Sequence, residues 1–324
     1  MTNPLLEVKN VSKYFPIQGG LLRRTRGYVR AVENVSFELA AGETLGIVGE
    51  SGSGKSTLGR TIIRLYDPTE GSIRYQGQDL AHLHQKALRP YRRHIQMVFQ
   101  DPYASLNPRM TIGALIEEPL KLHTNLNRKE REEEIRRLLK IVGLSPDAHT
   151  RYPHEFSGGQ RQRIGIARAL SIKPSLIIAD EPVSALDVSI QAQVINLMMA
   201  LKASFNLSYL FIAHDLSVVK HISDRVMVMY LGHVVESAPK KELFQHPLHP
   251  YTEALLSAVP EPNPRKKKER IVLSGDIPSA ANPPKGCVFH TRCPKVMAVC
   301  KEVKPPLQEV APQHWTACHL YTQG

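Results

Sequence analysis

Four short motifs in a fixed order constrain this 324-residue chain more than any other feature. GESGSGKS spans Gly49–Ser56, FSGGQ spans Phe156–Gln160, LIIADEP spans Leu176–Pro182 and IAHD spans Ile212–Asp215. The first motif fits the pattern of a phosphate-binding loop, because it follows an apolar string that ends at Val48 and precedes a helical stretch. The sequence therefore predicts a nucleoside triphosphate site in an α/β fold.

The glycine-rich loop predicts specific contacts with a triphosphate. Its glycines allow backbone N–H groups to turn toward the phosphates, and the helix that follows presents the positive end of its dipole. Lys55 is expected to reach the β- and γ-phosphates, and Ser56 is expected to bind Mg²⁺. The predicted ATP-binding residues of the loop are Gly49, Glu50, Ser51, Gly52, Ser53, Gly54, Lys55, Ser56 and Thr57.

Two acidic residues end the apolar run that starts at Leu176. Asp180 is expected to be a strand-end carboxylate on the Mg²⁺ side of the site, as in other enzymes with a phosphate-binding loop. Glu181 follows directly and is expected to polarise the attacking water as a general base. A buried structural acid is the alternative for Glu181.

The FSGGQ motif heads a helix rich in Arg and Ala. Its polar residues are Ser157, Gly158, Gly159 and Gln160. A Ser-Gly-Gly turn before a helix offers backbone N–H donors and a dipole end to an anion, although the same string alone is also an ordinary N-cap. The position of the motif ahead of Asp180 favours anion binding.

Alternating β-rich and helical strings between Leu5 and about Val235 predict an α/β domain. Buried strands are expected at 44–48, 95–99, 175–179 and 207–213, and half-exposed antiparallel strands at 6–8, 35–39 and 72–75. A helical insert is expected at about 101–168. The predicted fold is a P-loop NTPase domain over residues 1–260, with an antiparallel β subdomain and this insert. A small, loop-rich, cysteine-containing segment is expected to follow at 261–324.

These motifs resemble those of the ABC-type ATPases. GESGSGKS is similar to the Walker A motif of that family, FSGGQ to its signature motif, and LIIADEP to its Walker B motif with a glutamate. Gln100 falls where the family has its Q-loop glutamine, and His214 falls where it has its switch histidine. The stretch similar to the D-loop consists of Ser184, Ala185, Leu186 and Asp187. The resemblance covers residues 5–235.

The resemblance implies an ATP site shared between two subunits. Two such domains would pair head to tail, with each ATP between the P-loop of one and the signature motif of the other. Gln100 would sense the γ-phosphate and help to hold Mg²⁺ together with Ser56 and Asp180. His214 would hold the γ-phosphate and the attacking water. The resemblance favours Phe15 as the residue that stacks on adenine, with Tyr14 as the alternative, because the stretch at 17–30 is extra compared with compact members of the family.

Two further stretches, 101–113 and 246–260, resemble the peptide-importing branch of this family. The unmodified SGGQ implies the second ATPase subunit of a bacterial dipeptide or oligopeptide importer. The expected partners are a second ABC ATPase subunit in a heterodimer, two integral membrane permease subunits and a periplasmic substrate-binding protein. The expected location is the cytoplasmic face of the inner membrane. Nickel complexes, glutathione or murein peptides stay open as cargo, because the ATPase does not touch the cargo.

All four cysteines lie near the C-terminus, in the pattern C-x5-C-x6-C-x17-C. They are Cys287, Cys293, Cys300 and Cys318. A cytosolic compartment argues against disulfides, whereas four thiolates can bind Zn²⁺ or a [4Fe–4S] cluster. The wide spacing favours the cluster, with zinc and free thiols as alternatives. Similar tails in peptide-importer ATPases are associated with a [4Fe–4S] cluster, which the resemblance therefore implies here.

The formal net charge of +12 fits nucleic acid, an anionic membrane surface or a plain solvated surface. The basic runs at 23–30 and 265–268 lack interleaved aromatic residues, so no nucleic-acid partner is expected. A soluble ABC-type ATPase acting on nucleic acid is the alternative function.

No apolar run reaches the roughly 18 residues needed to cross a bilayer, and the N-terminus lacks a signal peptide pattern. A cytosolic protein is therefore expected.

Overall fold

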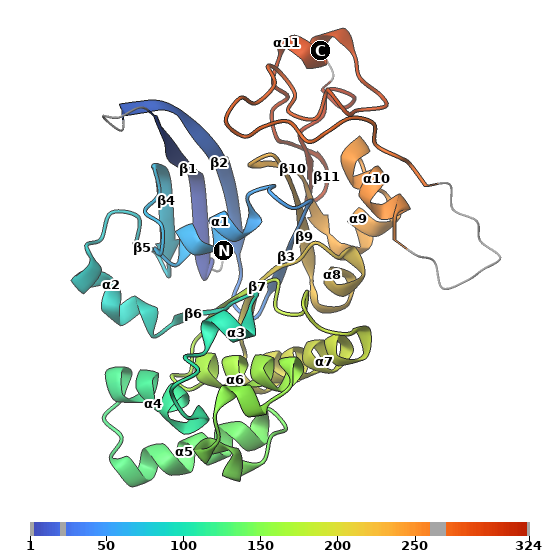
Figure 1. The fold of residues 1–324 in the computed structure, drawn as a ribbon. Coiled ribbons are helices and arrows are strands. Elements are labelled where there is room, and N and C mark those ends of the chain that lie inside the picture. Colours follow the sequence, from blue (N-terminus) through green and yellow to red (C-terminus); the bar gives the residue numbers. More distant parts are fainter. Residues whose placement is uncertain (1–2, 20–23, 260–269, 323–324) are drawn as a thin grey trace, which may run out of the picture. The chain divides into compact units, whose positions relative to one another are not determined.

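The computed structural model describes residues 3–19, 24–259 and 270–322 (Figure 1). The chain divides into two compact units, of which the first comprises 1–40, 44–82 and 213–324 and the second comprises 41–43 and 83–212. The basic residues Arg23 and 265–268 lie outside the described residues, as does the predicted domain boundary near residue 260. That boundary stays a prediction.

The first unit contains two sheets. Its strands are β1 (Leu6–Gly19), β2 (Arg24–Leu39), β3 (Thr44–Val48), β4 (Glu70–Tyr75), β5 (Gln78–Asp79), β9 (Arg225–Tyr230), β10 (His233–Pro239), β11 (Gln308–Ala311) and β12 (His314–Thr316). One sheet is antiparallel with the order β2-β1-β4-β5. In the other, strands of this unit follow the order β11-β12-β10-β9-β3, and only β3 and β9 are parallel.

Burial explains why these strings form strands. All five residues of β3 are buried, as expected for a strand with neighbours that cover both of its faces. The helices of the first unit are α1 (Lys55–Ile62), α8 (Leu216–Ile222), α9 (Lys240–Gln245), α10 (Pro250–Ser257) and α11 (Ala298–Glu302). The described residues of the 17–30 stretch belong to the β1–β2 hairpin, in which Tyr14 pairs with Arg30 and Phe15 with Val29.

The second unit combines a parallel sheet with the predicted helical insert. Its strands are β6 (Ile95–Val98), β7 (Leu176–Asp180) and β8 (Ser208–Ile212), with β7 in the middle. Its helices are α2 (Gln85–Arg92), α3 (Pro102–Ser105), α4 (Ile112–His123), α5 (Arg128–Ile141), α6 (Gly158–Leu170) and α7 (Val188–Phe205), with 3₁₀ turns η1 (Pro146–Thr150) and η2 (Pro153–Glu155). The expected α/β fold class is confirmed, and the bounds of the insert stay a prediction.

The C-terminal tail (residues 270–322 as described) has more regular structure than its sequence predicts. Strands β11 and β12 extend the second sheet of the first unit, where Thr316 pairs with Glu236 of β10. The side chain of Phe289 is fully buried and packs on the rings of Tyr230 and Tyr251. Phe289 and Val288 of the tail are thus buried in the first unit, whereas other apolar side chains of the tail, such as Val272 and Val303, are exposed.

Buried Glu236 joins the tail to the first unit. Its carboxylate is fully buried and lies 2.7 Å from Nε2 of His314 in β12. It also accepts the backbone N–H groups of Leu248 and His249 at 2.7 and 3.0 Å. A buried carboxylate needs such partners, because leaving it unpaired costs several kcal/mol.

We expect His314→Ala to destabilise the full chain by about 2–4 kcal/mol, since it leaves one oxygen of Glu236 without its side-chain partner. The free energy of unfolding from a urea titration measures the effect. His319→Ala is the control, because its contact with the carbonyl of Val303 is exposed and its loss is worth about 1 kcal/mol or less. Equal effects of the two changes would contradict this role of Glu236.

Within the described residues, no helix is long and apolar enough to cross a membrane.

Candidate functional site

The predicted site residues fall in both units. The P-loop, Phe15, Tyr14, His214 and the four cysteines belong to the first unit. Gln100, the Ser157–Gln160 motif, Asp180, Glu181 and the 184–187 stretch belong to the second. Each group is described within its own unit.

The P-loop follows β3 and ends in α1, as predicted. Gly54 precedes α1 with φ = 99°, and a Cβ atom there would stand 2.1 Å from the carbonyl oxygen of Ala31. Gly49 has φ = 153°, and a Cβ atom there would meet the carbonyl oxygen of Met229 at 2.1 Å. These two positions accept only glycine, because the backbone of neighbouring strands lies directly behind the loop.

The ammonium group of Lys55 lies inside the loop and is almost fully buried. Its Nζ donates to the carbonyl oxygens of Gly49 and Glu50 at 2.8 and 2.9 Å and to Oγ of Ser53 at 3.3 Å. The loop backbone therefore holds the cation that is predicted to reach the phosphates.

Glu50, the second residue of the loop, has contacts that its sequence position does not predict. Its backbone N–H donates to the hydroxyl of Tyr251 in α10 at 2.8 Å. Its carboxylate accepts two bonds from the guanidinium of Arg292, at 2.7 and 3.1 Å. The paired carboxylate raises the pKa of Arg292, so the guanidinium stays charged.

Tyr14 and Phe15, the two candidates for stacking on adenine, have different partners. The hydroxyl of Tyr14 donates to Oε1 of Glu33 at 2.9 Å. The ring of Phe15 packs edge-on against Tyr66 at 5.3 Å, with Nζ of Lys13 5.0 Å from its centroid. Because their paired residues Arg30 and Val29 are neighbours on β2, the two side chains point to opposite faces of the hairpin.

In the second unit, Gln100 and Glu181 lie together. Nε2 of Gln100 donates to Oε2 of Glu181 at 3.2 Å. Glu181 directly follows fully buried Asp180 at the carboxyl end of β7. Its φ of 46° is left-handed, and its N–H donates to the carbonyl of Ile212 at 2.9 Å. A non-glycine residue held in this region carries strain of about 1–3 kcal/mol, which is typical of functional sites.

The FSGGQ motif forms the N-terminus of α6. Ser157 and Gln160 form a capping box, in which each side chain accepts the backbone N–H of the other residue, at 3.4 and 3.0 Å. The Leu186 side chain of the 184–187 stretch lies beside Gly158, where a Cβ atom would be 3.3 Å from it. Asp187 is the N-cap position of α7. The structure thus brings the two motifs together within the second unit.

His214 lies in the first unit between β8 and α8, next to Asp215, whose side chain caps α8. The preceding residue, Ala213, donates its N–H to the carbonyl of Ile47 in β3 at 3.0 Å. This bond places His214 at the end of the strand that leads into the P-loop.

The four cysteines gather in the tail. Cys287, Cys300 and Cys318 are buried, and Cys293 is partly buried. Burial, with a further contribution from the other three thiols, raises the pKa of Cys287 to about 11. Burial also raises the pKa of Cys293 and Cys318, and for all three thiols a backbone hydrogen bond from the residue two positions on partly opposes this shift. Among the described residues, however, no group of three or more His, Cys, Asp or Glu side chains is arranged to hold a metal ion.

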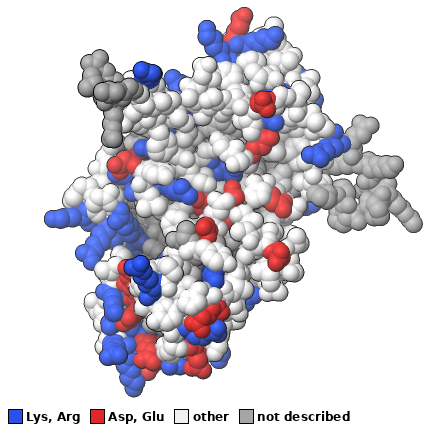
Figure 2. Space-filling model, in the orientation of Figure 1, with Lys and Arg blue, Asp and Glu red and all other residues white. Residues whose placement is uncertain are grey.

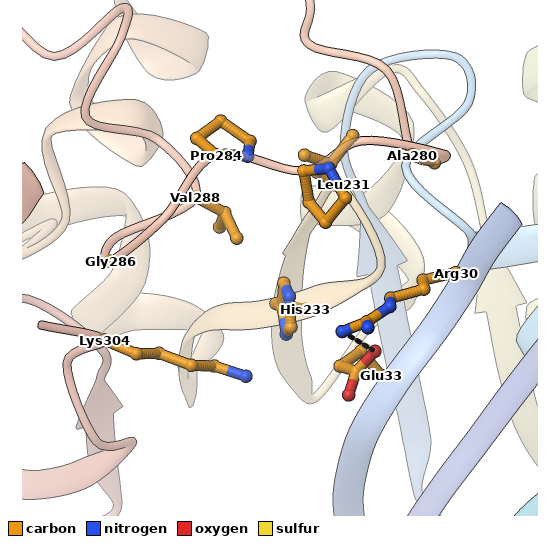
Figure 3. A pocket seen from close by; sticks show the side chains of 10 residues that line it. Arg30, Glu33, Leu231, His233, Ala280, Pro284, Gly286, Val288 and Lys304 are labelled. Atoms are coloured by element: carbon orange, nitrogen blue, oxygen red, sulfur yellow. Dashed lines mark ion pairs between the residues drawn. The ribbon is translucent and has the colours of Figure 1, made fainter. Parts of the chain in front are cut away.

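A cavity of about 170 Å³ lies between the β2 strand, the β9–β10 turn and the tail (Figure 3). Arg30, Glu33, His233 and Lys304 supply its polar lining, and Arg30 lies 3.8 Å from Glu33. Burial, helped by nearby Lys304, lowers the pKa of His233 to about 3, so this imidazole is neutral at pH 7. No residue of the P-loop lines the cavity.

Surface charge is mixed over much of the face in Figure 2, although Lys and Arg side chains gather over α2. Helix α5 carries acidic and basic side chains in pairs such as Arg137 and Glu134 at 2.6 Å. Acidic and basic side chains are therefore interspersed over this part of the surface.

Comparison with known proteins identifies the family. A model of the ABC transporter family matches residues 32–184, and a model of the oligopeptide/dipeptide transporter C-terminal region matches residues 235–300. The chain is 63% identical to the oligopeptide transport ATP-binding protein AppF of Bacillus subtilis (strain 168), over 98% of each chain. The chain belongs to the ABC transporter ATPases.

Other relatives agree with this assignment. This ABC ATPase is 56% identical to the putative oligopeptide transport ATP-binding protein YkfD of Bacillus subtilis (strain 168), over 98% of this chain and 96% of the relative. A dimeric post-hydrolysis state of the ATP-binding cassette MJ0796 bound to ADP and Pi superposes with a TM-score of 0.65 at 30% identity. That match covers 72% of this chain and 98% of the other. The expected family and its ATPase activity are confirmed.

We expect Gly54→Ala to weaken MgATP binding by at least about tenfold, because the new Cβ would displace Ala31 or the loop at a strained φ. Titration with a fluorescent ATP analogue measures the loss. Gly165→Ala in α6 is the matched control, since a Cβ there meets nothing within 4 Å. It should leave binding unchanged and slightly raise stability. Unchanged ATP binding in Gly54→Ala would contradict the expected role of the loop.

Proposed function

We propose that this chain is the ATP-hydrolysing subunit of an ABC importer for dipeptides or oligopeptides. One observation carries the proposal: a single chain combines the ATPase motifs with a C-terminal region that matches those of oligopeptide and dipeptide transporters. The relatives named as oligopeptide transport ATP-binding proteins match nearly the whole chain. Nickel complexes, glutathione or murein peptides are the alternative cargo.

We assign Glu181 as the general base for water attack on the γ-phosphate of ATP. The amide of Gln100 donates to its carboxylate at 3.2 Å, and this bond orients the carboxylate. Ser56, Asp180 and Gln100 would hold Mg²⁺, which supplies charge neutralisation at the phosphates. His214 would contact the γ-phosphate.

The signature motif is proposed to act on the ATP of a partner subunit. The Ser157–Gln160 capping box satisfies two donors at the start of α6, and the helix dipole points its positive end outward from that terminus. Closure of two ATPase subunits, head to tail, would place this terminus on the partner's γ-phosphate. The 184–187 stretch lies beside Gly158 and would contact the partner as well.

We propose Phe15 as the residue that stacks on adenine. The hydroxyl of Tyr14 is bonded to Glu33, a residue of the cavity lining, which leaves Tyr14 on the cavity face of the hairpin. Phe15 lies on the opposite face.

The proposed assembly contains a second ABC ATPase subunit, two membrane permeases and a periplasmic substrate-binding protein. This chain would lie at the cytoplasmic face of the membrane, where its permease partners hold it. A soluble ATPase acting on nucleic acid is the alternative. Tight, salt-sensitive DNA or RNA binding without any binding to permeases would favour that alternative.

Glu181→Gln tests the ATPase mechanism. We expect it to lower turnover by a factor on the order of 10²–10⁴ and to retain MgATP binding, because the amide cannot accept a proton from water. Phosphate release from the assembled transporter measures turnover. Glu133→Gln, on the exposed face of α5, is the control and should behave as wild type.

Uptake of a labelled dipeptide into proteoliposomes tests the cargo, and uptake of a nickel complex alone would contradict the peptide assignment.

We further propose that Cys287, Cys293, Cys300 and Cys318 bind a [4Fe–4S] cluster, with zinc as the alternative. The support is the chemistry of the donor set: four neighbouring thiols in the tail, three of which receive a backbone N–H. Because no three of these side chains are arranged as ligands, binding would require the segments that carry them to move closer together. When bound, the group would supply a structural crosslink between these segments.

Iron, sulfide and zinc analysis of anaerobically purified chain tests this proposal. We expect about four irons and four sulfides per chain, with absorption near 400 nm. Cys300→Ser should lower the metal content. About one zinc per chain and no iron would support a zinc site in place of the cluster. The absence of both metals would contradict a metal site.

A further inference from the structure

Arg292 of the tail contacts the P-loop directly. It lies between Cys287 and Cys293 in the sequence, and only 8% of its surface is exposed. Nη1 and Nη2 of its guanidinium donate to the two carboxylate oxygens of Glu50 at 2.7 and 3.1 Å. A bidentate ion pair of this kind fixes the orientation of both groups more strictly than a single hydrogen bond between them.

The guanidinium is held in place by the packing of the tail. The N–H of Arg292 donates to the carbonyl of Phe289 at 3.0 Å. The buried ring of Phe289 packs against Tyr230 and Tyr251 at centroid distances of 5.2 and 5.3 Å. Tyr230 also lies 5.9 Å from the guanidinium carbon. The position of the Arg292 side chain therefore depends on the folded tail.

Glu50 in turn connects Arg292 to Lys55. The carbonyl oxygen of Glu50 accepts a bond from Nζ of Lys55 at 2.9 Å, and its N–H donates to Tyr251. Three partners therefore hold Glu50: Arg292 at its side chain, Tyr251 at its N–H and Lys55 at its carbonyl oxygen. Two of them come from elements that follow the ATPase motifs in the sequence.

We propose that Arg292 is a positioning residue of the ATP site. By pairing with Glu50 it neutralises a negative charge in the phosphate-binding loop and fixes the loop before the nucleotide binds. The C-terminal tail thereby sets the affinity of the chain for MgATP. The proposal rests on the proposed function only in that the P-loop binds MgATP, and it requires no metal at the cysteines.

The direction of the effect follows from charge. Without the guanidinium, the Glu50 carboxylate is an uncompensated charge in a partly buried place, and it repels the phosphates that the loop accepts. Lysine at position 292 would keep the positive charge but could not form the bidentate pair with Glu50. Removal of both charges together leaves no unpaired group, so the cost should largely disappear.

The first experiment measures the dissociation constant of a fluorescent ATP analogue with Mg²⁺ on the purified full chain. We expect Arg292→Met to weaken binding by roughly tenfold and Arg292→Lys by about threefold. Lys295→Met is the matched control: it removes a cation of the same tail that pairs with Glu253 of α10 at 2.7 Å and touches no residue of the P-loop. This control should bind the nucleotide as wild type does.

The decisive variant combines Arg292→Met with Glu50→Gln. It should bind the ATP analogue more tightly than Arg292→Met alone, because two neutral side chains of similar size replace the ion pair and no charge is left unpaired. In the assembled transporter, Arg292→Met should raise KM for ATP and leave kcat nearly unchanged. Thermal unfolding of each variant shows whether it is folded, and Arg292→Lys preserves the test if Arg292→Met does not fold.

Two results would overturn the proposal. One is equal binding by wild type, Arg292→Met and Lys295→Met. The other is a double variant that binds no more tightly than Arg292→Met, since the two residues would then not be coupled. A wild-type chain that binds no nucleotide would instead contradict the proposed function, so the two failures are distinguishable.

Discussion

The phosphate-binding loop is supported from behind by backbone carbonyl oxygens, and the first unit is organised around this constraint. The carbonyls of Ala31 in β2 and Met229 in β9 lie where a Cβ atom of Gly54 or Gly49 would be. The carbonyl of Ser53 also accepts the N–H of Gly232 from the β9–β10 turn at 3.0 Å. The loop therefore keeps its shape only while strands from both sheets of this unit are in place, which ties ATP binding to the fold.

Two pairs of polar side chains join the tail to earlier residues of this unit. Glu236 with His314 and Glu50 with Arg292 are pairs between the tail and earlier residues, and each has at least one buried member. Such pairs add little net stability, because desolvation offsets their attraction, but an unpaired member is costly. They fix the position of the tail without binding it strongly, and a segment that leaves many of its apolar side chains exposed gains its order in this way.

Sequence motifs predicted the local structure around the candidate site well and missed the long-range contacts of the tail. The P-loop, the strand before Asp180 and the helix after Ser157 follow from patterns within a few residues, and the structure has them where they were expected. Arg292 and Glu50 are 242 positions apart, so no local pattern links them. The strand pairing of β12 was missed because a three-residue strand carries too little alternation to be recognised.

The two faces of the β1–β2 hairpin carry different groups. Because neighbouring residues on a strand point to opposite faces, Tyr14 and Arg30 share one face and Phe15 and Val29 share the other. The first face carries Glu33 and the cavity shared with the tail, whereas the second carries an aromatic ring with an edge-on partner, Tyr66. The surface that faces the tail and the ring proposed for adenine therefore lie on opposite faces of the same hairpin.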